Sequence, residues 1–252
     1  KSPASQRGRD FAVMLAVFRD FGYDVEWRVI NAAEYGNAQR RRRVFIFAYR
    51  QDLSFAAQQE IKTDNEILFT NGFFASTFPV KADPYKSRFS EVELPQDVVN
   101  ISENFSYQFF SAGIMKKGKV TTTHPETLNP QAVPLRDILE ENADESFYLT
   151  EKELEKFAYL RGSKKIERTS KDGYKYIYSE GGMSPTDDLN LPGRTMLTSE
   201  SSVNRSTHII NINGRIRYLT PVEAERLNGF PDNWTEMLPL KTRYFVMGNA
   251  LV

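Results

Sequence analysis

The chain has 252 residues, of which 40% are hydrophobic and 26% charged. These fractions are typical of a globular protein and exclude a disordered or fibrous class. The longest apolar run, residues 44–49, is far shorter than the roughly 20 residues that cross a bilayer, and no secretory signal pattern opens the chain. Cysteine is absent, which excludes disulfides, thiolate metal sites and thiol nucleophiles within this chain. We therefore expect no membrane partner.

Positive charge is concentrated at the start of the chain. The formal net charge is zero, yet residues 1–50 hold ten Lys or Arg against five Asp or Glu. Overall charge therefore does not indicate a nucleic-acid binder. The run Arg40–Arg43 is the obvious place for a local polyanion site, whereas the acid-rich residues 137–155 suit a solvated face turned away from it.

The first fifty residues predict a helix, a strand, a loop and a second strand. Apolar residues at helical spacing over 11–21 predict a helix that Gly22 ends. Residues 23–29 alternate apolar and charged, which predicts a strand with one buried face. The uniformly apolar run 44–49 predicts a strand buried on both faces, as in a parallel sheet covered by helices.

Residues 51–214 read as an α+β insert of short alternating runs separated by Gly and Pro. A capping box of Thr150 and Glu153 predicts a helix over 151–161, and Asp172-Gly173 predicts a hairpin turn. The core face of that helix is expected to hold Leu154, Phe157 and Ala158.

The end of the chain is regular again. Thr220-Pro221-Val222-Glu223 combines an N-cap, a proline at the first helical position and a capping-box glutamate, so it predicts a helix that stops at Gly229. A last helix is expected to begin at Gly248-Asn249 and to continue beyond the end of the sequence.

The arginine run leads directly into the second predicted strand. Side chains alternate along extended backbone, so Arg41 and Arg43 should point to one side and Arg40 and Arg42 to the other. Guanidinium groups suit phosphate oxygens and the carbonyl edge of a base. One pair can therefore line a cleft, although a solvated basic loop is the alternative.

Three segments resemble consecutive motifs of the DNA (cytosine-5-)-methyltransferases. Residues 31–44, from Asn31 to Val44, resemble motif VIII, and the helix and strand before them match motif VII. Residues 217–232 resemble motif IX, and residues 248–252 resemble the start of motif X. The segments occur in the family's order, and the long gap between motifs VIII and IX is where that family inserts its target-recognition domain.

The resemblance implies an α/β fold. The chain would be the C-terminal part of a Rossmann-like, S-adenosylmethionine-dependent methyltransferase domain with an inserted α+β target-recognition domain. Residues 1–50 would hold motifs VII and VIII, residues 51–214 the target-recognition domain, and residues 215–252 the return to the catalytic domain.

Several parts of the family pattern are missing. The cofactor glycine loop, the Pro-Cys catalytic loop and the Glu-Asn-Val motif precede motif VII in that family, and none occurs here. Residues 1–9 resemble the segment just after Glu-Asn-Val. Attack on cytosine C6 needs a thiolate, so we expect an N-terminal catalytic half, in the same gene or a separate chain, to complete the enzyme.

The resemblance also implies roles for single residues. In motif VIII, Arg43 would contact the O2 side of a flipped cytosine, Arg41 would hold backbone phosphate or the missing Glu, and Gln39 would support the loop. These contacts help to replace the stacking energy that a flipped base loses. The positions expected near the carboxylate of S-adenosylmethionine, at a helix N-terminus, are Gly248, Asn249 and Ala250.

Sequence readout is expected from the middle domain in the major groove of double-stranded DNA. Five clustered polar residues in a Ser-rich loop are candidates, although each could instead form a turn or contact phosphate. We expect Lys164, Lys165 and Arg168 to contact phosphate or to solvate the surface, Arg226 to brace the recognition domain, and no metal site, because His124 and His208 are isolated. The five candidates are Arg194, Thr195, Ser199, Asn204 and Arg205.

The sequence thus predicts part of a DNA (cytosine-5-)-methyltransferase, cytoplasmic and nucleoid-associated, of a bacterial restriction–modification system. It would transfer methyl from S-adenosylmethionine to C5 of a flipped cytosine. The alternative is a non-catalytic specificity subunit or an inactive remnant, which the absence of cysteine favours for the chain alone. The intact motif VIII favours the enzyme, and an arginine-rich RNA-binding protein would not explain motif IX.

Overall fold

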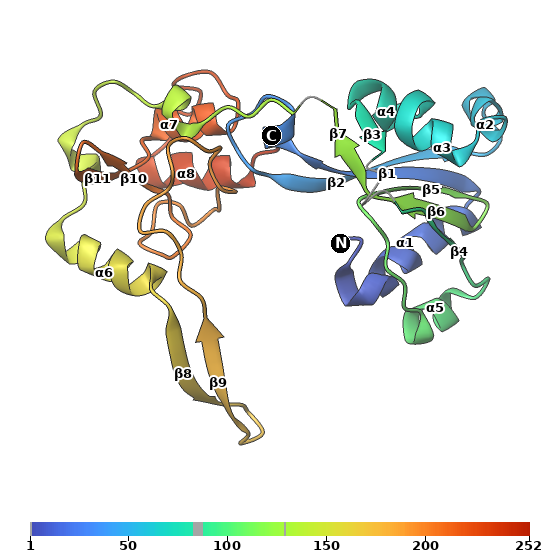
Figure 1. Ribbon diagram of the computed structural model, residues 1–252, viewed down its shortest axis with the longest axis horizontal. Helices are drawn as coiled ribbons and strands as arrows, with labels where there is room; N and C mark the ends of the chain where they lie inside the picture. Colours follow the sequence, from blue (N-terminus) through green and yellow to red (C-terminus); the bar gives the residue numbers. More distant parts are fainter. Residues whose placement is uncertain (1, 83–87, 129) are drawn as a thin grey trace. The chain divides into compact units, whose positions relative to one another are not determined.

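The computed structural model describes residues 2–82, 88–128 and 130–252. The chain forms two compact units, each made of two separate stretches of sequence (Figure 1). Unit 1 comprises residues 1–31 and 42–130, and unit 2 comprises residues 32–41 and 131–252. The units are defined by packing, so the predicted division at residues 51 and 214 into catalytic and recognition domains stays a prediction.

Unit 1 is built on a five-stranded sheet of order β2-β1-β5-β6-β4. One face packs against α1 and α5 through Phe11, Trp27 and Ile101, and the other is covered by residues 64–78, including Ile67. The elements are α1 (Arg9–Asp20), β1 (Tyr23–Asn31), β2 (Arg42–Arg50), α2 (Ser54–Glu60), α3 (Asp64–Glu66), α4 (Phe73–Thr77), β3 (Val80–Ala82), β4 (Ser90–Glu93), α5 (Val98–Asn104), β5 (Ala112–Lys116), β6 (Lys119–Thr123) and β7 (Pro125–Thr127).

The predicted first helix and first strand are confirmed as α1 and β1. The prediction that the charged face of β1 is exposed to solvent is wrong. Asp24, Glu26 and Arg28 on β1 are only 3%, 1% and 2% exposed. Glu26 accepts hydrogen bonds from the amides of Phe73 and Phe74, both at 2.9 Å. Burial outweighs those bonds and raises the pKa of Glu26. The charged face is buried because residues from far along the chain cover it and satisfy its polar atoms.

The expectation of a parallel sheet is also wrong. Strand β2 pairs antiparallel with β1, from Tyr23 opposite Arg50 to Asn31 opposite Arg42. It lies at the end of the strand order, and residues 44–48 are only partly buried. Between β1 and β2 lie only residues 32–41, fewer than the dozen or more that a parallel crossover needs. The fold is mixed α/β with a central antiparallel sheet.

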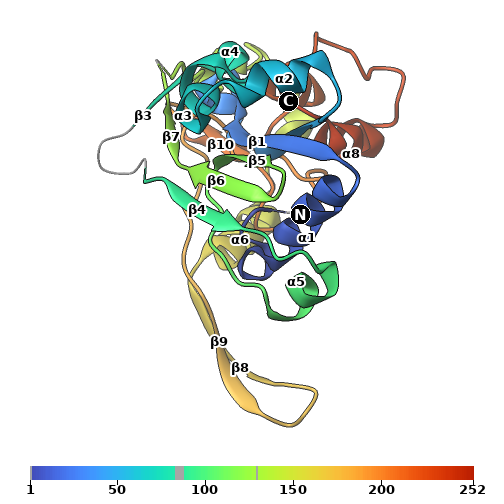
Figure 2. The ribbon, with the colours of Figure 1, turned by 90° about the vertical axis from the view of Figure 1, so that its right-hand side faces the viewer.

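Unit 2 has a core of its own, in which Met196, Leu219 and Leu227 are buried together with Tyr244 and Met247. A long β8–β9 hairpin projects from it at the end of α6 (Figures 1 and 2). The elements are α6 (Glu151–Arg161), β8 (Lys164–Thr169), β9 (Lys175–Glu180), β10 (Ile209–Ile212), β11 (Arg215–Tyr218), α7 (Pro221–Leu227) and α8 (Leu240–Asn249).

Local signals predicted most of these elements correctly. The capping boxes of Thr150 with Glu153 and of Thr220 with Glu223 are both formed, and the hairpin turns through Gly173 at φ 81°. In α6, however, Ala158 was expected in the core but is exposed. The buried residues of this helix are Phe157 and Arg161.

The last helix differs from its prediction. Helix α8 ends at Asn249 rather than beginning at Gly248, and the amide of Ala250 donates to the Met247 carbonyl. Tyr244, Met247 and Gly248 form its buried stripe at helical spacing, a signal that lies before the motif X resemblance. In residues 2–82, 88–128 and 130–252, no helix is both long and apolar enough to cross a membrane.

Candidate functional site

The arginine run begins inside unit 2, where residues 32–41 lie along the segment around Gly193. The amide of Arg40 donates to the Gly193 carbonyl and the amide of Gly193 to the Ala38 carbonyl, each at 2.7 Å. Closer to the start of the loop, the amide of Gly36 donates to the Gln131 carbonyl at 3.0 Å. Main-chain bonds therefore hold the loop in place before any side chain contributes.

Gln39 is completely buried at the centre of this arrangement. Its Nε2 donates to the Leu227 carbonyl at 3.3 Å and to Oδ1 of Asn228 at 3.0 Å. Its Oε1 accepts from the amide of Met196 at 3.1 Å. One side chain thus joins motif VIII to the end of the motif IX helix and to the 193–198 segment.

Arg41 is buried beside Gln39 and extends the same network. Its guanidinium donates to the carbonyls of Met196 and Gly248, each at 3.1 Å, and to Oε1 of Gln39 at 3.3 Å. The expected alternation is confirmed, because Arg40 and Arg42 on either side are exposed. Motifs VIII, IX and X therefore meet around two buried side chains. We call Gln39 and Arg41 with their partners Met196, Asn228 and Gly248 the motif junction.

Arg43 lies outside the motif junction, on β2 in unit 1. It is partly buried, and its Nη1 donates to the carbonyl of Arg42 at 2.8 Å. The structure gives it no carboxylate partner within the described ranges. A guanidinium held by one main-chain contact retains further donors for a ligand.

Gly248 has a packing role in the motif junction. A Cβ atom at this position would lie 2.4 Å from the amide nitrogen of Thr198 and 2.5 Å from the carbonyl carbon of Leu197. Both are main-chain atoms, so neither can move without displacing the 193–198 segment. Glycine is therefore required at position 248, because the main chain of the 193–198 segment approaches too closely for a side chain.

Gly248→Ala is expected to lower the free energy of unfolding by about 2 kcal/mol, because it forces these backbones apart. Urea unfolding followed by circular dichroism measures the change. Gly181→Ala is the matched control, since nothing lies within 4 Å of the added methyl there. Equal stability of the two variants would contradict the packing role.

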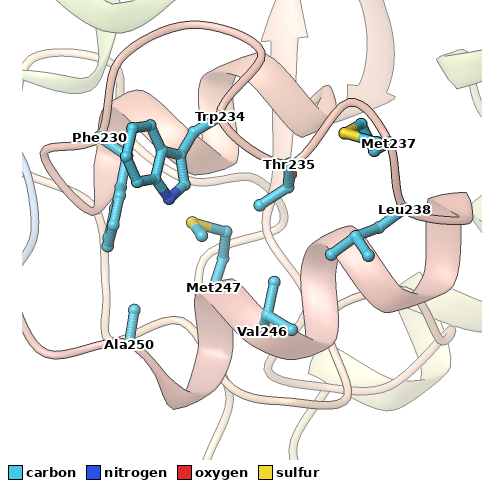
Figure 3. Close-up of a pocket in the computed structure, with 8 residues that line it drawn as sticks. All are labelled: Phe230, Trp234, Thr235, Met237, Leu238, Val246, Met247 and Ala250. Carbon is cyan, nitrogen blue, oxygen red and sulfur yellow. The ribbon is translucent and has the colours of Figure 1, made fainter.

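The other two expected cofactor positions differ from Gly248. Asn249 is exposed, and its side-chain amide has no hydrogen-bond partner in the part of the chain that the structure describes, whereas the Ala250 amide is already bound to Met247. Ala250 also borders an apolar pocket of about 490 Å³, formed with Phe230, Trp234 and others on the opposite side (Figure 3). All three positions lie at the end of α8, so the expected helix N-terminus is wrong.

The proposed DNA readers form two groups. Two arginines are bound to carboxylates: Arg194 to Asp187 at 2.6 Å and Arg205 to Glu180 at 2.6 Å. The other three make loop contacts, with Oγ1 of Thr195 donating to the Arg40 carbonyl at 2.7 Å. Nδ2 of Asn204 donates to the carbonyl and Oγ of Ser199. Thr195, Ser199 and Asn204 are exposed or partly so.

Asp187, whose side chain is only 6% exposed, is a residue that the sequence did not single out. It binds Arg194 and also Arg161, the latter at 2.9 Å. Although burial opposes ionisation, the hydrogen bond from Arg194 and the nearby positive charges hold the pKa of Asp187 well below its ordinary value. Arg194 is only 7 positions from Asp187, whereas Arg161 is 26 positions away, so no local pattern predicts that one carboxylate binds both.

The remaining expectations concern one arginine and two histidines. Arg226 binds Asp232 and donates to the carbonyls of Ile138 and Leu139, a bracing contact. His208 is fully buried with its Nδ1 2.9 Å from Oε1 of Glu200. Its Nε2 has no hydrogen-bond partner among the described residues, so the expectation of a satisfied histidine holds for one ring nitrogen alone. The Nδ1 of the other histidine is likewise 2.8 Å from a serine Oγ, in the pair His124 and Ser111.

The sequence model of the C-5 cytosine-specific DNA methylases matches residues 4–252. The chain belongs to this family. It is 58% identical over its whole length to the type II methyltransferase M.Sau3AI of Staphylococcus aureus and spans 61% of that protein. It is 23% identical to M.NlaIV of Neisseria lactamica, spanning 66% of it.

Two solved structures of methyltransferases are also similar. Entamoeba histolytica methyltransferase EhMeth aligns with 96% of this chain and 53% of its own, at 15% identity and a TM-score of 0.46. Spodoptera frugiperda DNMT2, as a triple mutant, aligns with 93% of this chain and 56% of its own, at 13% identity and a TM-score of 0.47.

Proposed function

We propose that the chain is the C-terminal part of a DNA (cytosine-5-)-methyltransferase that methylates C5 of a cytosine flipped from a specific duplex sequence. The motif junction carries the proposal. Gln39 and Arg41 fix the chain immediately before Arg43 by buried hydrogen bonds to motifs IX and X. Such fixed geometry suits a base-contacting guanidinium at the next alternate position, because catalytic contacts depend on small displacements.

The three proposed site residues of motif VIII have two different roles. Arg43 is the proposed catalytic residue, contacting the O2 side of the flipped cytosine. Gln39 and Arg41 are positioning residues, since their polar groups are engaged with the protein itself. This differs from the expectation that Arg41 holds phosphate or a glutamate.

S-adenosylmethionine is the proposed methyl donor, and it supplies an activated methyl group when bound. Of the three expected positions only Asn249 has a side chain exposed and available to a polar ligand, while Gly248 is buried in the motif junction. The side chain of Asn249 would therefore hold the carboxylate end of the donor. The remaining contacts would come from protein outside this chain.

The nucleophile must come from elsewhere, because the chain has no cysteine and attack on C6 needs a thiolate. We infer that an N-terminal half supplies it, in keeping with the 61% of M.Sau3AI that the chain spans. The whole enzyme would act on double-stranded DNA in the cytoplasm of a bacterium, within a restriction–modification system. Thr195, Ser199 and Asn204 are the favoured base readers, since Arg194 and Arg205 are paired with carboxylates.

The test joins this chain to the part of M.Sau3AI outside the matched region and measures tritiated methyl transfer to DNA of mixed sequence. Arg43→Ala is expected to reduce the rate of transfer about 100-fold, as loss of one preorganised donor does. Arg42→Ala, an exposed neighbour, is the control and should retain the rate. Folding of each variant is checked by circular dichroism.

Two results would contradict the proposal. Equal rates for Arg43→Ala and Arg42→Ala would remove Arg43 from the catalytic site. Failure of the joined protein to transfer methyl, together with salt-dependent binding to particular duplexes, would favour the non-catalytic specificity subunit.

A further inference from the structure

A cavity of about 240 Å³ lies in unit 2, apart from the motif junction. It is formed by the segments around Phe147 and Glu200, the residues just before β10, the end of β11 and the first turn of α8. None of the residues that line it belongs to the motif junction or is a proposed catalytic or cofactor residue. Pockets for drug-sized ligands begin at about 300 Å³, so this cavity suits a more compact molecule.

A buried pair, Glu200 and His208, forms one part of the cavity wall. Their side chains are 2% and 0% exposed. Oε1 of Glu200 accepts a hydrogen bond from the main-chain amide of His208 at 2.5 Å and lies 2.9 Å from Nδ1 of the same residue. A carboxylate can only accept, so the proton of the second bond is on Nδ1. In the neutral imidazole ring, Nε2 is then an acceptor.

Each member of this pair retains one polar atom without a partner. Within residues 2–82, 88–128 and 130–252, neither Nε2 of His208 nor Oε2 of Glu200 forms a hydrogen bond. Most buried polar atoms are hydrogen-bonded, because an unsatisfied one loses the bonds that water would give it. Two residues on one cavity wall, each with a spare acceptor, therefore indicate a ligand that supplies donors.

The Glu200 carboxylate also has no lysine or arginine beside it. Its one ion-pair contact in the described part of the chain is with His208, which is charged only when protonated. The buried guanidinium groups of Arg161 and Arg194 are bound to Asp187 instead. Hydrogen bonds to a carboxylate are strongest when the donor is a cation. A cationic N–H donor is therefore favoured over a neutral one.

Aromatic rings line another part of the cavity, at Phe147, Tyr218 and Tyr244. The hydroxyl of Tyr244 donates to the Leu219 carbonyl at 2.6 Å, and that of Tyr218 to Oε1 of Glu153 at 2.9 Å. Both hydroxyls are thus in use, and the rings themselves remain available to a ligand. Aromatic rings attract cations as well as apolar groups.

We propose that this cavity binds a compact organic cation, an amidinium or primary ammonium group on an apolar body. The N–H groups of the cation donate to Oε2 of Glu200 and Nε2 of His208, and its body lies against Tyr218 and Tyr244. The site is separate from methyl transfer, because it shares no residue with the motif junction or with Arg43.

Nuclear magnetic resonance of the histidine rings tests this site, because the chain contains only two histidines. In protein labelled with ¹³C and ¹⁵N histidine, His124→Gln removes one ring signal and assigns the other to His208. Benzamidine is the probe, and it should shift the His208 signal with a dissociation constant of about 1 mM, as expected of a small fragment. The His124 signal is the internal control, since His124 belongs to unit 1 and does not line the cavity.

Benzamide and benzoate are matched probes that keep the ring and replace the cation by a neutral or an anionic group. Both should bind at least about tenfold more weakly than benzamidine, because they lack a charged donor. Lys241 is an exposed residue at this cavity. Lys241→Gln should therefore not weaken benzamidine binding, whereas it would weaken binding of an anion.

Glu200→Gln tests the carboxylate, since glutamine keeps an oxygen for the His208 amide but has no charge. Benzamidine should bind this variant about tenfold more weakly. Glu236→Gln, the same change at an exposed residue outside the cavity, should leave binding unchanged. Leu240→Trp is a second variant that leaves the buried pair intact. Leu240 is 52% exposed and lines the cavity, so the larger side chain should also reduce binding. Circular dichroism checks the fold of each variant.

Three results would overturn the inference. The first is an unmoved His208 signal at about ten times the expected dissociation constant, which would leave a cavity that holds water only. The second is equal or tighter binding of benzoate, which would reject a cationic ligand. The third is equal benzamidine binding by Glu200→Gln and Glu236→Gln, which would place the probe elsewhere. Methyl transfer by the joined protein is measured independently, so the proposed function stands or fails separately.

Discussion

Glu223→Ala is expected to lower the free energy of unfolding by about 4 kcal/mol, a large part of the stability of a typical domain. Glu223 is fully buried, and its two oxygens accept from the Arg217 guanidinium, each at 2.7 Å. It also accepts from the amides of Thr220 at 2.8 Å and Glu140 at 2.9 Å. The alanine variant leaves a buried guanidinium without a counter-charge and removes the half of the α7 capping box that the Glu223 carboxylate supplies.

Urea unfolding of Glu223→Ala beside Glu236→Ala measures this effect, since Glu236 is an exposed glutamate. A double-mutant cycle with Arg217→Met should show that the two losses are less than additive, because both variants break the same pair. A loss below about 1 kcal/mol for Glu223→Ala, the size expected of a surface ion pair, would contradict the argument.

Arg41→Met is expected to cost about 3 kcal/mol, because it leaves the buried carbonyls of Met196 and Gly248 without their donor. Arg41→Lys should recover little of the loss, since an ammonium cannot reproduce the planar fork that reaches both carbonyls. Hydrogen exchange of the amides around Met196 and Gly248, with urea unfolding, reports the change.

Arg40→Met is the control for Arg41→Met, because the Arg40 side chain is exposed and its contacts to Gly193 and Thr195 use main-chain atoms. If Arg41 instead served only to bind phosphate or substrate, both methionine variants would be equally stable. In that case only DNA binding or methyl transfer would separate them.

Local chemistry made part of the fold predictable. The capping boxes at Thr150 and Thr220 predicted α6 and α7 because a cap involves residues three apart. The alternation over the arginine run predicted which arginines are exposed for a similarly local reason. The family itself was predictable from the order of its motifs, and the match over residues 4–252 confirms it.

Burial of charge was not predictable in the same way. Glu26 on β1 reads as a solvent-facing residue, and its burial depends on amides at Phe73 and Phe74, 47 and 48 positions away. The motif junction shows the same limit, since the resemblance assigned Arg41 to a ligand. Its partners at Met196 and Gly248 are 155 and 207 positions away, distances at which no pattern of neighbouring residues carries information.

The motif junction also sets the order in which the protein can fold during synthesis. Residues 32–41 belong to unit 2, yet the partner of Arg41 in α8 is made 207 residues later. At about 5–20 residues per second the loop waits about 10–40 s for that partner. The residues that this chain gives to unit 1 end at residue 130, so they are all made before most of unit 2. Unit 2 closes only when its last helix is available, so exposed arginines of the loop face the cell throughout that interval.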